Sequence, residues 1–286
     1  MASIRYLLLS SIVISNTQER FDAVWVLFFF RYREDREMKM LRCYAEPSRW
    51  NGDKVMLASE EAHHLLHVLR AREGDVVTVF DGDGRQALAR MTTARGGTAE
   101  LTIVENAACG SPVVSITLIQ SIVREQRMDL IVQKATELGV SRIIPVQVER
   151  TVVRLGAEAQ ERRRERWQRI ALNAAKQCGV GWIPEIGRIV PVNDALKECS
   201  SLEFLLVASL EVDAVPLRSA IEKAKTRNPR TIGIAIGPEG DFTPAELAAA
   251  RAAGAVPVSL GNLVLRTETA SIHILSIMKY EFEPAQ

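Results

Sequence analysis

Two glycine-bearing segments in the last third of the chain combine residue types that could bind a ligand and act on it. The first, GPEG at 237–240, follows the apolar segment TIGIAI. The second, LGNLVLR at 260–266, follows the apolar segment VPVS and ends in Arg266. Glycine lets backbone N–H and C=O groups approach a ligand closely because it has no Cβ. An arginine beside such a loop could stabilise negative charge that develops on a substrate.

The elements that must position these segments follow from the hydrophobic pattern after residue 113. Apolar, β-branched segments there alternate with segments of helical spacing. The predicted strands are 113–120, 142–147, 204–209, 231–237 and 256–260, and the predicted helices are 127–139, 157–178, 215–224, 243–253 and 267–282. This alternation predicts an α/β domain with a mostly parallel sheet. Because ligands bind beyond the carboxyl ends of such strands, both glycine segments should border one pocket.

The glycine spacing indicates which classes of ligand the two loops could bind. The chain has neither G-x-G-x-x-G, which binds a pyrophosphate, nor a Walker loop. A dinucleotide or a nucleoside triphosphate is therefore disfavoured, although a nucleotide-dependent oxidoreductase stays as a weaker alternative. An adenosine without phosphate fits better, held by backbone hydrogen bonds and by the apolar side chains of Leu260, Leu263, Val264 and Leu265. Taken alone, each loop could also be an ordinary turn at the end of a strand, without a ligand.

The segment 40–108 shows mainly strand patterns. Short β-branched segments at 54–57, 75–80, 86–92 and 98–104 are separated by glycine-containing turns. One helix is predicted at 60–71, with Ser59 as its N-cap. The pattern predicts a small β-barrel, followed by a linker at 106–112 (NAACGSP).

Composition excludes several classes of site. The net charge is +1, so a nucleic-acid partner would have to bind a local basic patch. Cys43, Cys109, Cys178 and Cys199 form no C-x-x-C pair, which favours free thiols in a reducing compartment. The histidines at 63, 64 and 67 follow Glu60 and Glu61, but acidic residues are expected at a helix start, so no metal site is predicted.

Residues 1–39 are expected to be an extension outside the fold. The apolar stretch at 23–30 is far shorter than the ~20 residues needed to span a bilayer. A weak signal peptide at 6–14 is the alternative, but no small-x-small cleavage site follows it. We therefore expect a cytoplasmic protein without a membrane partner.

Several long motifs resemble, in order and spacing, those of the RsmE-type 16S rRNA (uracil-N3) methyltransferases, which are SPOUT-class enzymes. They are QKATELGV with IIPVQVERTVV, RWQRIALNAAKQCGVGWIPEI, IGPEGDFTPAE and LGNLVLRTETA. The segments MLRCYAEP and HHLLHVLRAREGDVVTVFDGDG resemble the small PUA-like N-terminal barrel of that family. The resemblance covers about 40–282.

The resemblance implies a PUA-like RNA-binding β-barrel at 40–108 and a SPOUT α/β domain with a deep trefoil knot at 113–286. It implies S-adenosylmethionine as cofactor and a homodimer that the helix 267–282 helps to form. The implied cofactor-binding residues are Ser209, Leu210, Glu211, Gly237, Pro238, Glu239, Gly240, Leu260, Gly261, Asn262, Leu263, Val264, Leu265 and Arg266.

The implied reaction methylates N3 of a uridine near the 3′ end of small-subunit ribosomal RNA. Arg266 is the candidate catalytic residue, since it could stabilise negative charge on a uracil carbonyl oxygen. The alternative for Arg266 is an ion pair with Glu268 or a neighbouring carboxylate. A non-catalytic RNA-binding factor for ribosome assembly, on the same fold, is the alternative function.

Five basic residues, at a strand end or at and within the predicted helices, are candidates for contacts with RNA phosphates. They are Arg124, Arg127, Arg150, Arg154 and Lys176. The arginines at 162–169 alternate with Glu161 and Glu165, which favours a solvated helix face. Two positions depart from the family pattern: Asp241 stands where a second glycine is usual, and Val180 where an arginine is frequent.

Overall fold

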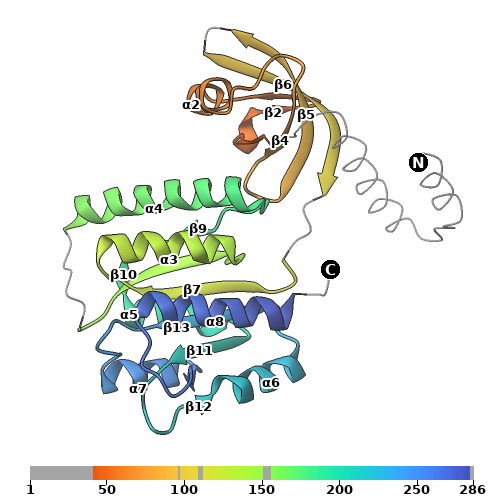
Figure 1. Cartoon of the computed structure of the whole chain (residues 1–286). Coiled ribbons are helices and arrows are strands. Elements are labelled where there is room, and N and C mark those ends of the chain that lie inside the picture. Colours follow the sequence, from red (N-terminus) through yellow and green to blue (C-terminus); the bar gives the residue numbers. More distant parts are fainter. Residues whose placement is uncertain (1–40, 96, 109–111, 151–155, 284–286) are drawn as a thin grey trace, which may run out of the picture. The chain divides into compact units, whose positions relative to one another are not determined.

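The structure is a computed structural model that describes residues 41–95, 97–108, 112–150 and 156–283 (Figure 1). The chain divides into two compact units, Met1–Leu41 and Arg42–Gln286, and the following description concerns the second. The predicted extension 1–39 lies outside the described residues. Within the described ranges, no helix combines the length and the apolar character needed to cross a membrane.

The C-terminal half is built on a parallel sheet with the strand order β10-β8-β7-β13-β11-β14-β12, and β9 pairs with β8. Every pairing in this sheet is parallel. The strands are β7 (Ser115–Ser121), β8 (Arg142–Gln147), β9 (Glu185–Ile186), β10 (Val190–Pro191), β11 (Phe204–Ala208), β12 (Val215–Pro216), β13 (Thr231–Ile236) and β14 (Val256–Ser259). The five predicted strands are thus confirmed, and the three missed ones have only two residues each, too few to show a period.

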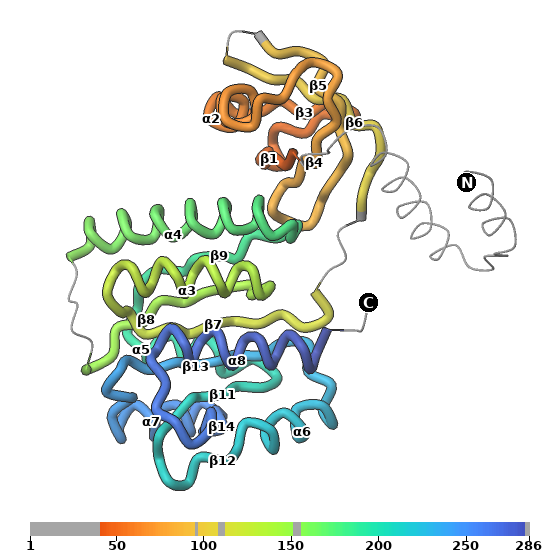
Figure 2. The backbone as a smooth tube through the Cα atoms, in the orientation of Figure 1, coloured from red at the N-terminus to blue at the C-terminus, as the bar shows by residue number. Residues whose placement is uncertain are grey.

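Helices cover both faces of this sheet (Figure 2). They are α3 (Glu125–Glu137), α4 (Ala157–Cys178), α5 (Val192–Glu198), α6 (Leu217–Arg227), α7 (Pro244–Ala252) and α8 (Thr267–Phe282). One core cluster joins the sheet to α3, α4, α6 and α8, and a second joins it to α5 and α7. Leu206 of β11 belongs to the first cluster, and its neighbours Leu205 and Val207 belong to the second. Because successive side chains alternate between two buried faces, β11 is apolar along its whole length.

Two helix predictions need correction. Helix α5 was not predicted, although Val192, Ala195, Leu196 and Cys199 have helical spacing and all four are buried. Helix α6 begins at Leu217 rather than at 215, because Val215–Pro216 pairs with β14 as the edge strand β12. A proline is tolerated on an edge strand, where its missing N–H breaks no ladder bond.

The N-terminal half forms a six-stranded sheet with the order β1-β4-β5-β6-β3-β2. Its strands are β1 (Arg42–Tyr44), β2 (Trp50–Asn51), β3 (Lys54–Met56), β4 (Val76–Phe80), β5 (Arg85–Arg95) and β6 (Thr98–Ala108). The predicted small β-barrel is corrected to a half-barrel, because the pairings of the described residues leave β1 and β2 as free edges. The predicted linker also begins later, since β6 continues to Ala108 by pairing with Arg85–Ala87 of β5.

The predicted helix 60–71 is shorter and less regular than expected. Helix α2 (Ser59–His63) passes into a π-helical turn, η2 (His64–Val68). Ala58 occupies the N-cap position, and the Ser59 side chain makes no capping bond. The helix ends early because the widened turn is followed by Arg70 with φ +58°, a left-handed conformation that no helix can continue. Two short 3₁₀ turns, η1 (Pro47–Arg49) and η3 (Cys199–Ser201), complete the elements.

Three cysteines within the described ranges are free thiols. Burial raises the pKa of Cys43 far above its ordinary value and the pKa of Cys199 to about 11, so both thiols stay protonated. The described residues include no group of three His, Cys, Asp or Glu side chains that could hold a metal ion. The predicted thiol at Cys109 lies outside the described residues.

The half-barrel is hydrogen-bonded to the segment after α4. Ile183 donates its N–H to the Gly82 carbonyl (2.9 Å), and Gly84 donates to the Gly181 carbonyl (3.3 Å). The Arg42 guanidinium donates to the Val180 carbonyl at 2.7 Å, so Val180 has a structural contact through its backbone. These bonds place the Gly84 backbone directly against the Trp182 ring, where an added Cβ would lie only 2.2 Å from a ring carbon.

We predict that Gly84→Ala lowers the free energy of unfolding by about 2–4 kcal/mol, because φ is +102° and the new methyl overlaps the Trp182 ring. Gly74→Ala is the matched control: its φ is +92°, but no atom lies within 4 Å. The control should cost about 1 kcal/mol from backbone strain alone. Urea unfolding measures both, and equal losses would show that the Trp182 contact contributes nothing.

Candidate active site

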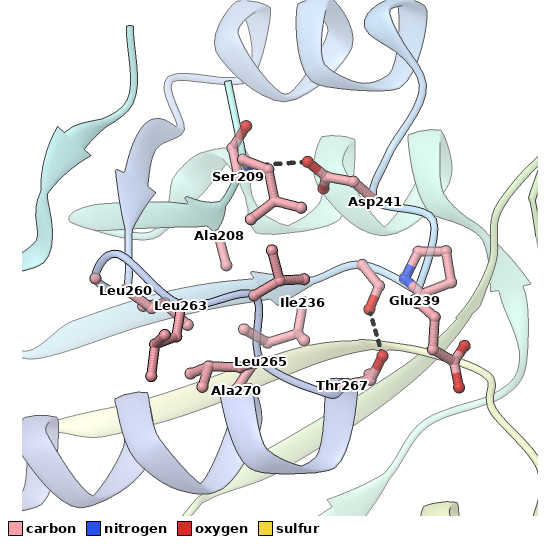
Figure 3. Close-up of a pocket in the computed structure, with 15 residues that line it drawn as sticks. Ala208, Ser209, Ile236, Glu239, Asp241, Leu260, Leu263, Leu265, Thr267 and Ala270 are labelled. Atoms are coloured by element: carbon pink, nitrogen blue, oxygen red, sulfur yellow. Dashed lines mark hydrogen bonds between the residues drawn. The ribbon is translucent and has the colours of Figure 1, made fainter. Parts of the chain in front are cut away.

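A cavity lies where the carboxyl ends of β11, β13 and β14 meet the first turns of α8 (Figure 3). Three loops and one helix line it. The lining residues are Ala208, Ser209, Leu210, Ile236, Gly237, Pro238, Glu239, Asp241, Leu260, Gly261, Leu263, Val264, Leu265, Thr267 and Ala270. The sequence prediction that both glycine segments border one pocket is therefore confirmed.

The cavity brings together most, but not all, of the residues predicted to bind a cofactor. Glu211, Gly240, Asn262 and Arg266 do not line it. The Glu211 carboxylate instead accepts a hydrogen bond from Arg251 at 2.8 Å. The lining residues that the prediction missed are Ala208, Ile236, Asp241, Thr267 and Ala270. Thr267 and Ala270 lie three apart, so helical spacing in α8 would have placed them on one face.

The first turn of α8 is tied to the loop after β13. Thr267 donates its hydroxyl to the Gly237 carbonyl at 3.3 Å (Figure 3). One turn later, the buried Ser271 hydroxyl lies 2.6 Å from Gln120 Oε1 and 2.9 Å from the Thr267 carbonyl. These contacts fix the helix start against β7 and β13, and so fix one wall of the cavity.

The start of α7 fixes the other end of the loop after β13. Thr243 and Glu246 form a capping box. The Thr243 N–H donates to Glu246 Oε2 at 2.8 Å, and the Glu246 N–H donates to Thr243 Oγ1 at 3.3 Å. The loop 237–242 is thereby held at both of its ends.

The charges around the cavity select the kind of ligand. Two carboxylates, Glu239 and Asp241, line it, and none of the lining residues is a lysine or an arginine. Phosphate groups would be repelled by this lining, whereas a cation would be attracted. The apolar walls from Leu260, Leu263 and Leu265 suit a flat aromatic group.

Arg127 on α3 lies between two acidic side chains beside the cavity. Its Nη1 bonds the Glu239 carboxylate, and its Nε lies 3.7 Å from Glu268 Oε1. Arg127 therefore links the loop after β13 to the first turn of α8. Arg266 is exposed, and its side chain has no ion pair or hydrogen bond with any described residue, so the predicted alternative of an Arg266–Glu268 pair is not formed here.

The other predicted RNA contacts differ in their surroundings. Arg124 is exposed at the N-cap of α3. The Arg150 guanidinium donates to the Gly240 carbonyl at the rim of the site. Lys176 is largely buried in an ion pair with Glu61, which favours a structural role. Arg154 lies outside the described residues.

The arginines of α4 are mostly paired on the helix surface. Arg162 bonds Glu158, Arg164 bonds Glu161, and Arg166 bonds Glu125 and Asp129. This agrees with the solvated face that the alternating charges predicted.

Comparison with known proteins assigns most of the chain to a single protein family. Residues 110–279 match the model of an RNA methyltransferase domain, and residues 57–104 match that of an RNA methyltransferase PUA domain. The ribosomal RNA small subunit methyltransferase E of Neisseria gonorrhoeae, solved with bound S-adenosylmethionine, is 34% identical. The alignment with that structure covers 84% of this chain and 97% of that chain, with a TM-score of 0.75.

The chain belongs to the RsmE family of small-subunit ribosomal RNA methyltransferases. Two further relatives are also named ribosomal RNA small subunit methyltransferase E. The protein of Bacillus subtilis is 29% identical over 231 residues, which cover 79% of this chain and 90% of the relative. The protein of Synechocystis is 32% identical over 218 residues, which cover 76% of this chain and 69% of the relative.

Asp241, which directly follows the GPEG segment, is an integral part of this site. Its φ is +60°, the left-handed conformation that a glycine would adopt there and that aspartate tolerates better than most residues. Its Oδ1 accepts the Phe242 N–H (2.8 Å), and its Oδ2 accepts the Leu210 N–H (2.9 Å; Figure 3). The second bond joins the loop after β11 to the loop after β13, which a glycine could not do.

We predict that Asp241→Ala lowers the free energy of unfolding by about 2 kcal/mol, because two hydrogen bonds are lost and alanine disfavours positive φ. Asp241→Asn should cost about 1 kcal/mol, since its single carbonyl oxygen replaces only one acceptor. As the control, Asp213→Ala removes only an exposed ion pair with Arg251 and should cost less than about 0.5 kcal/mol. Thermal and urea unfolding test this order; a neutral Asp241→Ala would contradict it.

Proposed function

We propose that the cavity binds S-adenosylmethionine. The observation that carries this proposal is a pocket made by three strand-end loops, lined by two carboxylates and apolar side chains, with no lysine or arginine in the lining. A sulfonium and an amino group are positive, so they are favoured by the Asp241 carboxylate, which has no ion-pair partner among the described residues; the Glu239 carboxylate is already paired with Arg127. An adenosine without phosphate needs no basic partner. The relative from Neisseria gonorrhoeae, whose structure contains this cofactor, supports the same assignment.

Specific residues of the chain have specific roles in the proposed cofactor binding. The backbone groups of 237–241 and 260–265 would hydrogen-bond the adenosyl group. Leu263 and Val264 are 71% and 75% exposed, and therefore available to pack against it. When bound, the cofactor supplies an activated methyl group, and the loops align it with the acceptor. Alignment of two reactants contributes up to about 7–11 kcal/mol to lowering a barrier.

We propose that the acceptor is N3 of a uridine near the 3′ end of small-subunit ribosomal RNA. The family assignment supports the RNA class, and the motif resemblance supports the atom. The N3–H must lose its proton as the bond forms, so negative charge develops on the uracil ring. Arg266 lies between the lining residues Leu265 and Thr267 and is exposed. Its guanidinium could therefore stabilise that charge.

The RNA would bind on the side of the cavity where exposed arginines lie. Arg124 and Arg150 are the proposed phosphate contacts among the described residues, since both are exposed. Arg127 and Lys176 already compensate carboxylates, so we assign them to holding the structure rather than to binding RNA.

The proposal includes a trefoil knot and a homodimer. Strand β13 lies between β7 and β11, and after β14 the chain returns so that α8 packs against α3 and β13. This return is compatible with the knot that the resemblance implies. Tyr280 of α8 is 84% exposed, and Ile277 lies one turn before it on the same helix. Such an apolar surface is compatible with contact to a second copy.

The alternative is a non-catalytic RNA-binding assembly factor with the same fold. Asp241 weakens this alternative, because it preserves the turn instead of disrupting it. The oxidoreductase alternative is dropped, because the acidic lining would repel the phosphates of a nicotinamide dinucleotide.

The function is tested by incubating the purified chain and methyl-labelled S-adenosylmethionine with small subunits from a strain that lacks this modification. We expect one labelled N3-methyluridine near the 3′ end of the RNA, located by mass spectrometry of nuclease fragments. Calorimetry on the same sample measures cofactor binding. Binding without methyl transfer would favour the assembly factor, and no binding at all would refute both the cofactor and the reaction.

We predict that Arg266→Ala lowers kcat about 100-fold, the effect of removing one donor to a developing oxyanion. Arg266→Lys should retain part of the activity, since it keeps the positive charge but loses the planar guanidinium. The cofactor Kd should change by less than about threefold, because Arg266 does not line the cavity. A change in Kd without a change in kcat would assign Arg266 to cofactor binding instead.

A further inference from the structure

The Glu246 carboxylate makes more contacts than a helix cap needs. Only 8% of Glu246 is exposed, and each of its two oxygens has a separate partner. Oε2 accepts from the Thr243 N–H at 2.8 Å, which is the capping bond at the start of α7. Oε1 accepts from the Glu149 N–H at 2.8 Å, in the connection between β8 and α4. These residues are 97 positions apart, so this second bond is a long-range tertiary contact.

The neighbouring Arg150 makes a parallel contact. Its guanidinium donates to the carbonyl of Gly240, in the loop that lines the cavity. A Cβ added at Gly240 would lie 3.4 Å from Arg150 Cδ, so the arginine stem packs directly over this glycine. Two successive residues, Glu149 through its backbone and Arg150 through its side chain, are thus attached to the segment 240–246.

The hydrogen bond from the Glu149 N–H to Glu246 restricts the position of the next residue, Arg150. The Glu149 residue itself is exposed, yet its N–H is bonded to a buried carboxylate. Among the described residues, the exposed turn at 149–150 has two long-range hydrogen bonds, this one and the surface contact of Arg150 to Gly240. A hydrogen bond to a charged acceptor is also stronger than one between neutral groups. Together with Val148, which is buried in the core, Glu246 therefore anchors the backbone just before Arg150.

We propose that Glu246 is a positioning residue that holds Arg150 at the rim of the cavity, in register with the loop 237–241, for contact with RNA. The inference rests on the proposed function, in which this cavity binds the methyl donor and Arg150 contacts the RNA backbone. It goes beyond that proposal because Glu246 touches neither ligand. It makes the RNA contact depend on a carboxylate buried behind the cofactor loop.

A glutamine at this position separates the two roles of the side chain. Glutamine has one carbonyl oxygen, and its NH₂ would face an N–H donor, so it can accept from Thr243 or from Glu149 but not from both. Thr243→Ala is the matched control, because it removes the hydroxyl that accepts the Glu246 N–H and donates to Glu246 Oε2 at 3.1 Å, and it leaves the separate Oε1 bond to Glu149 in place. Both variants weaken the cap, and only Glu246→Gln endangers the bond to Glu149.

The first test measures methyl transfer at varied concentrations of small subunits. We expect Glu246→Gln to raise the KM for the subunit about tenfold, with the Kd for S-adenosylmethionine changed less than about threefold. Thr243→Ala should leave this KM unchanged. Arg150→Ala should raise KM by a similar factor, and the double variant with Glu246→Gln should be no worse than either single one. Three outcomes would overturn the proposal. They are an unchanged KM in Glu246→Gln, an equal rise of KM in Thr243→Ala, and additive effects of Glu246→Gln and Arg150→Ala on KM in the double variant.

The second test does not depend on activity. Amide hydrogen exchange of the wild-type protein should show the Glu149 N–H protected, although its residue is exposed. Glu246→Gln should accelerate this exchange about tenfold, and Thr243→Ala should not. Rapid exchange of Glu149 in the wild type would overturn the anchor even if the variant fails to fold. Protected exchange in a protein that transfers no methyl group would refute the proposed function and leave the anchor intact.

Discussion

Parallel pairing of β13, β11 and β14 is the constraint on which the site depends. Since the three strands are neighbours and point the same way, their carboxyl ends reach the same edge of the sheet. Loops that begin at residues 209, 237 and 260 therefore meet around one cavity, although they are far apart in the sequence. The strands can be parallel neighbours because both of their faces are buried under helices. The apolar core and the polar cavity are thus two results of one arrangement.

Polar contacts between the loops then give the cavity its shape. Asp241 joins the loops after β11 and β13, and Thr267 joins the loop after β13 to α8. Arg127 links the same two segments through Glu239 and Glu268. Most of these bonds use side chains that also line the cavity or lie next to it. Changes in the lining would therefore alter the shape of the site as well as its chemistry.

The sequence was sufficient for the strands, the longer helices and the two glycine loops, because apolar periodicity and capping residues are local signals. The same local signals could not predict β9, β10 and β12. Each of these strands has only two residues, and they form a strand only because the fold places them beside another strand. The sequence-based prediction placed the start of the linker 106–112 too early, because β6 is extended to Ala108 by its pairing with β5. It also made the helix at 60–71 too long, since a π-helical turn and the positive φ of Arg70 have no clear sequence signal. Arg127 and Lys176 looked like free basic residues, because their acidic partners Glu239 and Glu61 are distant in the sequence.

The central claim is that the three loops enclose an adenosyl group with its sulfonium near the two carboxylates. A crystal structure of the protein with S-adenosylmethionine tests this claim most directly. The account predicts the adenosyl group between the loop 260–265 and the loop 237–241, with backbone hydrogen bonds to both and no bound phosphate or metal ion. A ligand bound at another surface, or a structure in which these loops pack together without admitting it, would contradict the account.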